Sequence, residues 1–338
     1  MKSSLSDICE YGKGKVNIDT LNTSTYISTE NMLPNKGGIT QASSLPKAKQ
    51  TQCFNAGDIL VSNIRPYFKK IWFAEFAGGC SNDVLVLKAK DNTYKRFLYY
   101  VLADDKFFEY SMATSKGTKM PRGDKVAIME YEVPCFSYSE QERIAEILGT
   151  LDEKIHNNIR INENLAKQAQ AIFEKLFPDI LSAERTGTLE QLISFSNGKK
   201  RPQSLGSIPV FGGNGILAYT SKSNADNCVI IGRVGAYCGN TFLCTSTCWV
   251  SDNAIQAKSK LTDSQLFVFH LLKNASLPSR HIGTGQPLMT QGILNAIPVL
   301  IPSESQINEF NAIVSPMQDM IDSNNAENTR LSNLRDSL

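Results

Sequence analysis

Loops of this sequence carry clusters of lysine, arginine and hydrogen-bonding side chains whose chemistry suits nucleic acid. Lysine serves a phosphate group as a point charge, whereas arginine, glutamine, serine and threonine can also reach base edges in the major groove. The first half of the chain offers EYGKGK, NIRPYFKK and SKGTKMPRG, with the candidate contacts Lys13, Lys15, Arg65, Lys69, Lys70, Lys116, Thr118, Lys119 and Arg122. The second half offers SNGKKRP, IGRVGAY and SRHIGTGQP, with Lys199, Lys200, Arg201, Arg233, Tyr237, Arg280, His281 and Gln286. Any single basic residue is more simply a solvated charge, but the clusters together predict nucleic-acid binding.

The distribution of charge along the chain supports this prediction. Residues 1–139 carry 18 basic and 14 acidic side chains, and residues 187–302 carry 9 and 4. The stretches between and after them are acidic, with 6 basic and 9 acidic side chains in 140–186 and with 2 and 6 in 303–338. Because Lys and Arg neutralise phosphates, we expect the basic stretches to contact nucleic acid and the acidic stretches to face protein.

No set of residues predicts catalysis or a metal site. The three histidines, His156, His270 and His281, lie in different predicted elements and form no ligand or triad spacing. The eight cysteines include no CxxC pair, so we expect reduced thiols instead of zinc ligands or disulfides. A P-loop is absent, the run FGGNGI at 211–216 predicts a turn, and no Asn/Asp-Pro-Pro-Tyr/Phe methyltransferase motif occurs.

Two long helices must position these loops. From about Ser139 to Phe177, just before Pro178, apolar residues recur with the heptad spacing of a coiled coil. The predicted core of this helix contains Ile144, Leu148, Leu151, Ile155, Asn158, Asn162 and Leu165. The C-terminal stretch repeats the spacing with Phe310, Val314, Met317, Ile321, Asn324, Asn328 and Leu331. Asparagines in a seam fix register and partner choice, so we expect the two helices to be partners. Pro316 predicts a kink or a late start in the second one.

The asparagine layer also indicates an internal duplication. Asn158 and Asn324, Asn162 and Asn328, and Leu165 and Leu331 are each 166 residues apart. The globular stretches repeat less strictly, at an offset of about 170, with GDILVSN and CSNDVLVLKAK followed later by NCVIIGR and WVSDNAIQAKSK. A Gly/Thr loop and a Pro-containing strand then precede Ser-Glu and the long helix in both copies.

This organisation predicts an α+β protein with four segments. β-branched runs such as Asp58–Asn63, Val84–Lys88, Cys228–Arg233 and Phe242–Thr245 read as strands. Helical patterns follow at Tyr94–Ser111 and Ser264–Asn274. We predict globular domains at 1–139 and 187–302 and helical spacers at 140–186 and 303–338. No apolar run reaches the roughly 20 residues of a membrane span, and no secretory signal is evident, so we expect a cytoplasmic protein without a membrane partner.

The whole chain resembles the specificity subunits of type I restriction-modification systems. The likeness lies in YISTENMLPNKGGI, GDILVSNIRPYFKKIW and SEQERIAEILGTLDEKI, and again in SIPVFGGNGILAYT, the GTGQP loop and IPSESQINEFNAIVSPMQDMI. It implies two target-recognition domains, each of which reads half of a split double-stranded DNA target. It also implies that the two helices pack antiparallel as a spacer, which gives the chain a pseudo-two-fold internal repeat.

The resemblance further implies that catalysis belongs to partners. Two methyltransferase subunits would bind S-adenosylmethionine, and a restriction motor subunit, in systems that have one, would use ATP, whereas this chain would bind no cofactor. A helix of 39 residues is about 58 Å long, which corresponds to roughly 17 base pairs, so a gapped target is expected. The alternative is a coiled-coil scaffold whose basic globules bind RNA or acidic proteins, and a hidden enzyme is a third reading.

Overall fold

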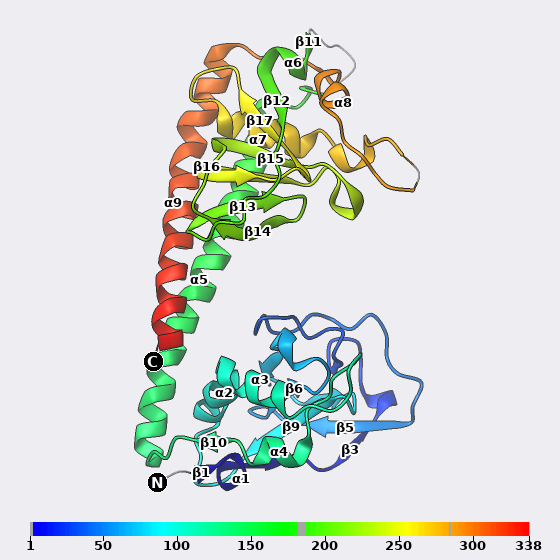
Figure 1. The fold of residues 1–338 in the computed structure, drawn as a ribbon, viewed down its shortest axis with the longest axis vertical. Coiled ribbons are helices and arrows are strands. Elements are labelled where there is room, and N and C mark those ends of the chain that lie inside the picture. Colours follow the sequence, from blue (N-terminus) through cyan, green and yellow to red (C-terminus); the bar gives the residue numbers. More distant parts are fainter. Residues whose placement is uncertain (1–2, 182–186, 284, 338) are drawn as a thin grey trace. The chain divides into compact units, whose positions relative to one another are not determined.

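The computed structural model describes residues 3–181, 187–283 and 285–337. The chain divides into two compact units. Unit 1 comprises Met1–His156 with Thr329–Leu338, and unit 2 comprises Asn157–Asn328. The division falls inside each of the two long helices, so each unit contains a globular part and one portion of both helices (Figure 1).

Unit 1 is built around two four-stranded sheets. The first has the order β2-β9-β6-β7 and the second β3-β5-β8-β4. Their strands are β2 (Cys9–Tyr11), β3 (Lys15–Asn17), β4 (Tyr26–Ile27), β5 (Gln50–Phe54), β6 (Ile59–Ser62), β7 (Ile71–Phe73), β8 (Gly78–Cys80) and β9 (Val84–Ala89). The helices are α1 (Leu5–Ile8), α2 (Lys95–Ala103), α3 (Asp105–Ala113) and α4 (Lys125–Met129), and β1 (Ser3–Ser4) pairs with β10 (Glu132–Val133).

Strand β6 shows why this fold forms, because its residues are buried on both faces of the sheet. Ile59 and Val61 lie in the core that includes Leu98 and Phe107 of the helices. Leu60 points to the opposite face and joins the core that contains Phe54 of the second sheet. Alternate residues of a strand point to opposite faces, so a short apolar run can serve two cores.

Unit 2 repeats this plan with one larger sheet. Its order is β12-β17-β15-β16-β13-β14. The strands are β12 (Ile193–Asn197), β13 (Ile208–Gly212), β14 (Gly215–Thr220), β15 (Ala225–Gly232), β16 (Thr241–Val250) and β17 (Ala254–Ser259). The helices are α6 (Leu189–Leu192), α7 (Gln265–Asn274) and α8 (Gln291–Asn295), and β11 (Gly187–Thr188) pairs with β18 (Pro298–Val299). As in unit 1, the central strand β15 serves two cores, with Val229 in one and Ile230 in the other.

The duplication expected from the sequence extends to strand register. In unit 1, Ile59 of β6 pairs with Leu87 of β9, and in unit 2, Val229 of β15 pairs with Ala257 of β17. Each partner in the second pair is 170 positions beyond its counterpart. Helices α2 and α7 begin at that offset as well, whereas α4 and α8 are 166 positions apart.

The two long helices are α5 (Tyr138–Leu176) and α9 (Glu304–Ser337). Each helix begins directly after a serine, and the backbone N–H of that serine donates to the side chain of the residue three positions later. The backbone N–H of Ser137 donates to Glu140 at 2.8 Å, and that of Ser303 donates to Gln306 at 3.0 Å. Such a capping contact satisfies a backbone donor that the first helical turn leaves free.

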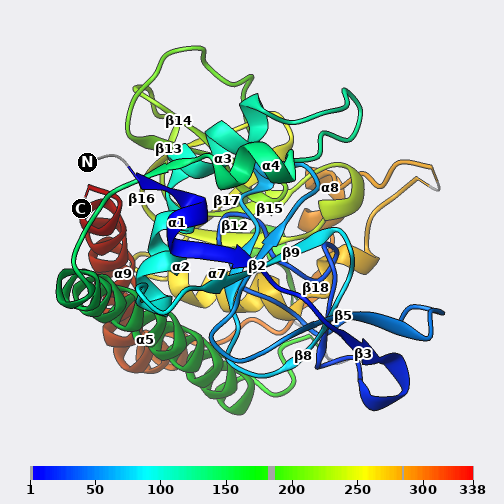
Figure 2. The same cartoon turned by 90° about the horizontal axis from the view of Figure 1, so that it is seen from below.

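The seam between α5 and α9 contains the predicted asparagines. Within unit 2, Nδ2 of Asn158 donates to Oδ1 of Asn328 at 2.9 Å, and Nδ2 of Asn324 donates to Oδ1 of Asn162 at 2.8 Å. The lower-numbered asparagine of α5 therefore meets the higher-numbered one of α9, so the helices are antiparallel in this unit. They lie side by side in both ribbon views (Figure 1, Figure 2). The other predicted core residues are all buried or half-buried.

One sequence prediction about helices was wrong, and of the two alternatives for the second long helix, a kink or a late start, the late start is excluded. The pattern Tyr94–Ser111 is two helices instead of one, because the Asp104 side chain accepts the N–H of Lys106 and caps a new helix. Helix α9 does not start late, since it runs through Pro316 without interruption. Phe310 and Val314, in the two turns before the proline, are fully buried among the aromatic side chains of unit 2, and this packing holds the helix in place.

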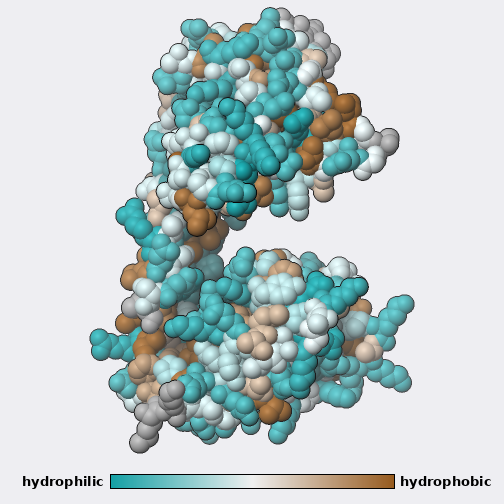
Figure 3. Space-filling model, viewed as in Figure 1, coloured by the Kyte–Doolittle hydropathy of each residue, from teal (hydrophilic) through white to brown (hydrophobic). Residues whose placement is uncertain are grey.

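Among the described residues, no helix combines the length and the apolar character that a membrane span requires. The space-filling view shows mostly hydrophilic atoms on the visible face of each unit, with hydrophobic atoms in separate patches (Figure 3).

Candidate nucleic-acid interface

Two loops of unit 1 that carry predicted contacts are joined by backbone hydrogen bonds. One follows β6 (residues 63–70), and the other connects α3 to α4 (residues 114–124). The N–H of Arg65 donates to the carbonyl of Pro121 at 2.8 Å, and the N–H of Gly123 donates to the carbonyl of Asn63 at 3.2 Å. The second loop is closed on itself, because Lys116 and Arg122 exchange backbone hydrogen bonds of 2.9 and 3.0 Å.

Unit 2 joins the corresponding loops in the same way. One follows β15 (residues 233–240), and the other precedes α8 (residues 280–283 and 285–290). The N–H of Gly235 donates to Pro287 at 3.0 Å, and the N–H of Met289 donates to Arg233 at 2.8 Å. Ile282 and Leu288 exchange backbone hydrogen bonds of 3.0 and 2.9 Å.

Every one of these bonds has a counterpart in the other unit. The first-loop residues correspond at an offset of 170 and the second-loop residues at 166, so that Arg65–Pro121 matches Gly235–Pro287. We call this pair of joined loops the paired-loop module. Its backbone geometry demands unusual conformations, because Arg65 has φ 51° and Gly235 has φ 73° at the same position. A left-handed conformation at a non-glycine residue costs free energy and is maintained only where the surroundings enforce it.

The side chains on the unit 1 module are cationic and exposed. Lys116 and Arg122 have side chains that are 82% and 55% exposed. Lys116 forms an ion pair with Asp124 at 2.5 Å, and Arg122 forms one with Asp83 at 3.2 Å. These acids lie at the base of the loops, so they orient the cations while leaving much of each one open to solvent. Thr118 and Lys119 lie at the exposed tip between them.

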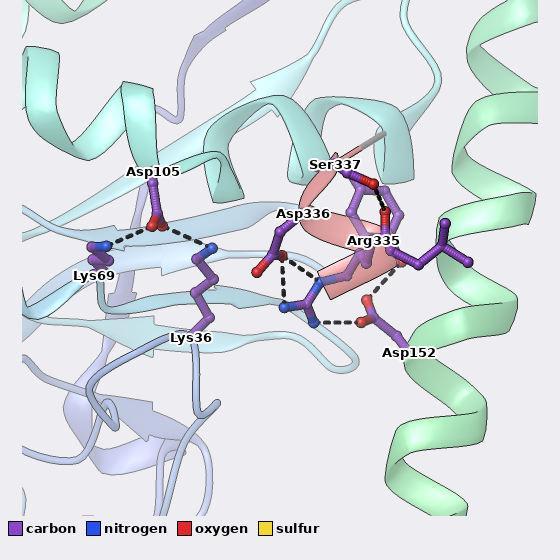
Figure 4. A network of polar contacts seen from close by, with 9 residues as sticks. Lys36, Lys69, Asp105, Asp152, Arg335, Asp336 and Ser337 are labelled. Atoms are coloured by element: carbon purple, nitrogen blue, oxygen red, sulfur yellow. Dashed lines mark hydrogen bonds and ion pairs between the residues drawn. The ribbon is translucent and has the colours of Figure 1, made fainter. Parts of the chain in front are cut away.

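A second cationic group of unit 1 adjoins the module. The ammonium groups of Lys69 and Lys36 both contact Asp105, at 2.7 and 2.9 Å (Figure 4). The hydrogen bond from Lys69, with further help from Lys36, holds the pKa of Asp105 below its usual range. Both lysines have positive φ, 50° and 61°, and the N–H of Lys36 donates to the carbonyl of Lys69. Two charges are therefore held side by side on a defined backbone.

Not every predicted contact of unit 1 takes part in the module. Lys70 is half-buried, and its ammonium group donates to the carbonyl of Thr29 at 2.6 Å. Its burial lowers its pKa, and it supports the loop from inside. Lys13 and Lys15 are exposed, but they belong to the sheet β3-β5-β8-β4: Lys15 begins β3, and Lys13 lies just before it. Arg65 is half-buried, and its Nε atom has no hydrogen-bond partner among the described residues.

The predicted contacts of unit 2 divide in a similar way. The Arg233 guanidinium donates to the carbonyl of Asp252 at 3.4 Å, and the backbone of Lys199 forms a β-bridge with Ser251. Arg233 and Lys199 therefore both lie against the turn before β17. Arg280 donates instead to the carbonyl of Ala275 at 2.7 Å. The exposed predicted contacts are Lys199, Lys200, Arg201, Tyr237, Arg280 and Gln286. His281 is half-buried, and Thr284 of the GTGQP loop lies outside the described residues.

The sequence prediction missed Tyr67, which lies in the unit 1 module. Its position is 170 residues before Tyr237, which was predicted, and the two side chains are 49% and 48% exposed. Applying the offset to Tyr237 would have found it.

The histidines and cysteines form no catalytic arrangement in the part of the chain that the structure describes. His270 is buried against Phe173, and its Nδ1 atom donates to Oε1 of Gln170 at 3.0 Å. Burial lowers the pKa of His270 to about 4. Within the described ranges, no group of three or more His, Cys, Asp or Glu side chains is placed to hold a metal ion. The cysteines carry free thiols, and Cys228, Cys244 and Cys248 are buried on adjacent strands.

The repeated α+β units, the antiparallel helices and the paired-loop modules together define a duplicated α+β protein. Residues 1–167 match the family model described as "Type I restriction modification DNA specificity domain". The resemblance seen in the sequence is therefore confirmed, and the chain is similar to type I restriction-modification specificity subunits.

Individual relatives agree with this assignment. The chain is 28% identical over 151 residues to the EcoDI specificity subunit of Escherichia coli, covering 43% of this chain and 33% of that one. It is 28% identical over 187 residues to the HindI specificity subunit of Haemophilus influenzae, covering 52% and 40%. These matches thus span less than half the length of either relative. The crystal structure of the type I S subunit from M. genitalium shares the fold, with a TM-score of 0.61, 19% identity and coverage of 100% of this chain and 94% of that chain.

Proposed function

We propose that this chain is the DNA-recognition subunit of a type I restriction-modification complex and that it reads a bipartite, gapped target, one half with each unit. The paired-loop module is the observation that carries this proposal. The same backbone hydrogen bonds recur in both units, but most side chains at equivalent positions differ.

The differences between the modules are of the kind that separate one base sequence from another. Lys116 and Arg122 of unit 1 correspond to Ile282 and Leu288 of unit 2. Cationic groups serve phosphates and guanine edges, whereas apolar groups contact thymine methyl groups. A common frame with different side chains suits two readers that recognise different half-sites.

The proposed subunit is not catalytic. Two methyltransferase subunits, which would bind S-adenosylmethionine, and a restriction motor subunit that uses ATP would supply the chemistry and dock on this chain. The family match favours this function over a coiled-coil scaffold, because residues 1–167 include the whole globular part of unit 1 as well as most of α5. Helix α5 has 39 residues. At a rise of 1.5 Å per residue it is about 58 Å long, which suits two separated half-sites.

Sequencing of DNA methylation in the host, with and without the gene for this chain, tests the proposal. We expect one gapped motif to lose its methylation on deletion, and the proposal fails if no such motif disappears. A finer test exchanges residues 1–139, or residues 187–302, for those of a relative with another target. Each exchange should alter a different half of the motif, and a change in both halves from one exchange would contradict the division of labour.

A further inference from the structure

The paired-loop modules share one exposed aromatic residue, and its position is the same in both. Tyr67 lies in the 3-10 turn Pro66–Phe68, and Tyr237 lies in the 3-10 turn Gly235–Tyr237. The two tyrosines are 170 residues apart, which is also the offset between Arg65 and Gly235, the matched backbone donors of the first loop. Their exposed fractions, 49% and 48%, are nearly equal.

The backbone that carries each tyrosine is held by further matched bonds. The N–H of Ser62 donates to Lys70 at 3.0 Å, and the N–H of Gly232 donates to Asn240 at 2.8 Å, which closes each loop at its base. Inside the turns, the N–H of Phe68 donates to Arg65, and the N–H of Cys238 donates to Gly235, both at 3.0 Å. The two rings therefore project from equivalent, closed turns.

Each tyrosine also packs against a neighbouring residue, through its ring in unit 1 and through its backbone and Cβ atom in unit 2. In unit 1 the Tyr67 ring lies 4.7 Å from the ring of Phe68, measured between centroids. In unit 2 the carbonyl oxygen of Tyr237 lies so close to Gly232 that a Cβ atom there would overlap it. An ideal Cβ at Gly213, in the turn between β13 and β14, would be 3.6 Å from the Cβ of Tyr237. A rigid aromatic side chain loses little conformational entropy on binding, and this makes it an efficient contact residue.

The surroundings of the rings indicate the kind of ligand. Arg65 and Lys69 flank the turn that carries Tyr67, and Arg233 begins the loop that carries Tyr237. An aromatic surface beside cations fits nucleic acid, because the ring contacts bases while the cations contact phosphates. Every other position of the first loop, residues 63–70 and 233–240, differs between the units, but the tyrosine does not.

We infer that Tyr67 and Tyr237 are equivalent base-contacting residues and that each ring packs against base edges in the groove of one half-site. This inference rests on the proposed function. It deepens that proposal by assigning one kind of contact that both half-sites share. The side chains around each tyrosine differ between the units, and they would add the sequence preference of each half-site.

The test compares Tyr67→Ala, Tyr237→Ala and the matching phenylalanine variants in the full chain, purified with its methyltransferase partner. Wild-type complex first selects its preferred sequence from a library of random duplex DNA. Binding to that duplex, and to versions with single base-pair changes in each half, is then measured. Tyr138→Ala and Tyr219→Ala serve as controls, since these tyrosines are 50% and 54% exposed but lie outside the modules.

We expect each alanine variant to bind the selected duplex about 5- to 150-fold more weakly, which is the range of losing one base contact. Tyr67→Ala should relax preference in one half-site only and Tyr237→Ala in the other. The phenylalanine variants and the controls should bind as wild type, because the ring and not the hydroxyl makes the proposed contact. Thermal unfolding should be unchanged, since the rings are exposed.

Three outcomes would overturn the inference. In the first, wild type selects a gapped sequence but the alanine variants bind it equally well and with the same preference. In the second, phenylalanine is as damaging as alanine, which would make the hydroxyl the contact. In the third, the alanine variants lose the methyltransferase partner and keep their DNA preference, which would make the turns a protein contact. The proposed function itself fails separately, if wild-type complex selects no sequence.

Discussion

Asp152 of α5 and Arg335 of α9 form an ion pair in unit 1, with Oδ1 of the aspartate 2.8 Å from Nη1 of the arginine (Figure 4). The other carboxylate oxygen accepts the hydroxyl of Tyr100, on α2, at 2.8 Å. Burial opposes the charge on Arg335, but its bonds to Asp152 and Asp336 raise its pKa. One carboxylate thus connects three helices, two of which are separated by more than half of the chain.

Replacing Arg335 by methionine should destabilise unit 1. The side chain of Asp152 is only 18% exposed, so its charge would lose its main partner in a poorly solvated place. We expect a loss of about 1–2 kcal/mol in the free energy of unfolding, measured by urea denaturation. This loss is smaller than that for a fully buried ion pair, because Arg335 is partly exposed. Arg330→Met, at an exposed position of the same helix, is the matched control. Equal losses from both variants would contradict the assignment.

The asparagine seam should show non-additive energetics. Asn158 is 1% exposed and donates to Asn328 and to Glu327. Asn158→Leu therefore removes two hydrogen bonds at a buried position of the seam and should cost about 1–3 kcal/mol. The double variant Asn158→Leu with Asn328→Leu should cost less than the sum of the single variants, because two leucines can pack against each other. Strict additivity in urea denaturation would show that the pair does not interact, and Asn157→Leu, an exposed neighbour, provides the control.

Unit 2 should lose stability in mild acid through His270. Burial lowers the pKa of this histidine to about 4, from an ordinary value of 6.5. Between these values the unfolded chain binds a proton that the folded chain does not, so stability falls as the pH is lowered from about 6.5 to about 4. The full effect is on the order of 3 kcal/mol.

The control for this prediction is a variant without the titrating group. His270→Leu should flatten the dependence of the unfolding midpoint on pH in this range, whereas His156→Gln, at an exposed position of α5, should leave the dependence as it is. A slope that persists unchanged in His270→Leu would assign the effect to other residues.

The two modules should differ in their contribution to the salt dependence of DNA binding. Lys116→Gln and Arg122→Gln should each reduce the slope of log K against log salt concentration by about 0.9, because each removes one phosphate contact. Ile282→Gln changes the position in unit 2 that corresponds to Lys116 and adds no charge, so it should leave the slope unaltered. If the slope is the same for Lys116→Gln, Arg122→Gln and wild type, these cations do not contact phosphate.

Features with a regular period were predictable from the sequence. The heptad spacing of Ile144 to Leu165 placed α5 within one residue at each end, and the repeated asparagines indicated the partner helix. Periodicity works here because a helix places every third or fourth side chain on one face, whatever the rest of the chain does. The 166 and 170 offsets likewise followed from the residues themselves, and they hold for strand register and for helix starts.

The candidate interface was predictable only as a set of regions. Lys70 belonged to the same cluster as Lys69, yet it is directed inward to Thr29, while Lys69 faces Asp105. Neighbours in a loop diverge because the path of the backbone sets the direction of each side chain, and bonds to distant segments set that path.

The sequence by itself determined the repeat, the helices and the basic character of the globular segments, because these depend on local spacing and composition. Only the tertiary structure decided that Arg65 meets Pro121 and that Gly235 meets Pro287. Those relationships join segments about 50 or more residues apart, and such contacts become favourable only when the sheets and helices have brought the loops together.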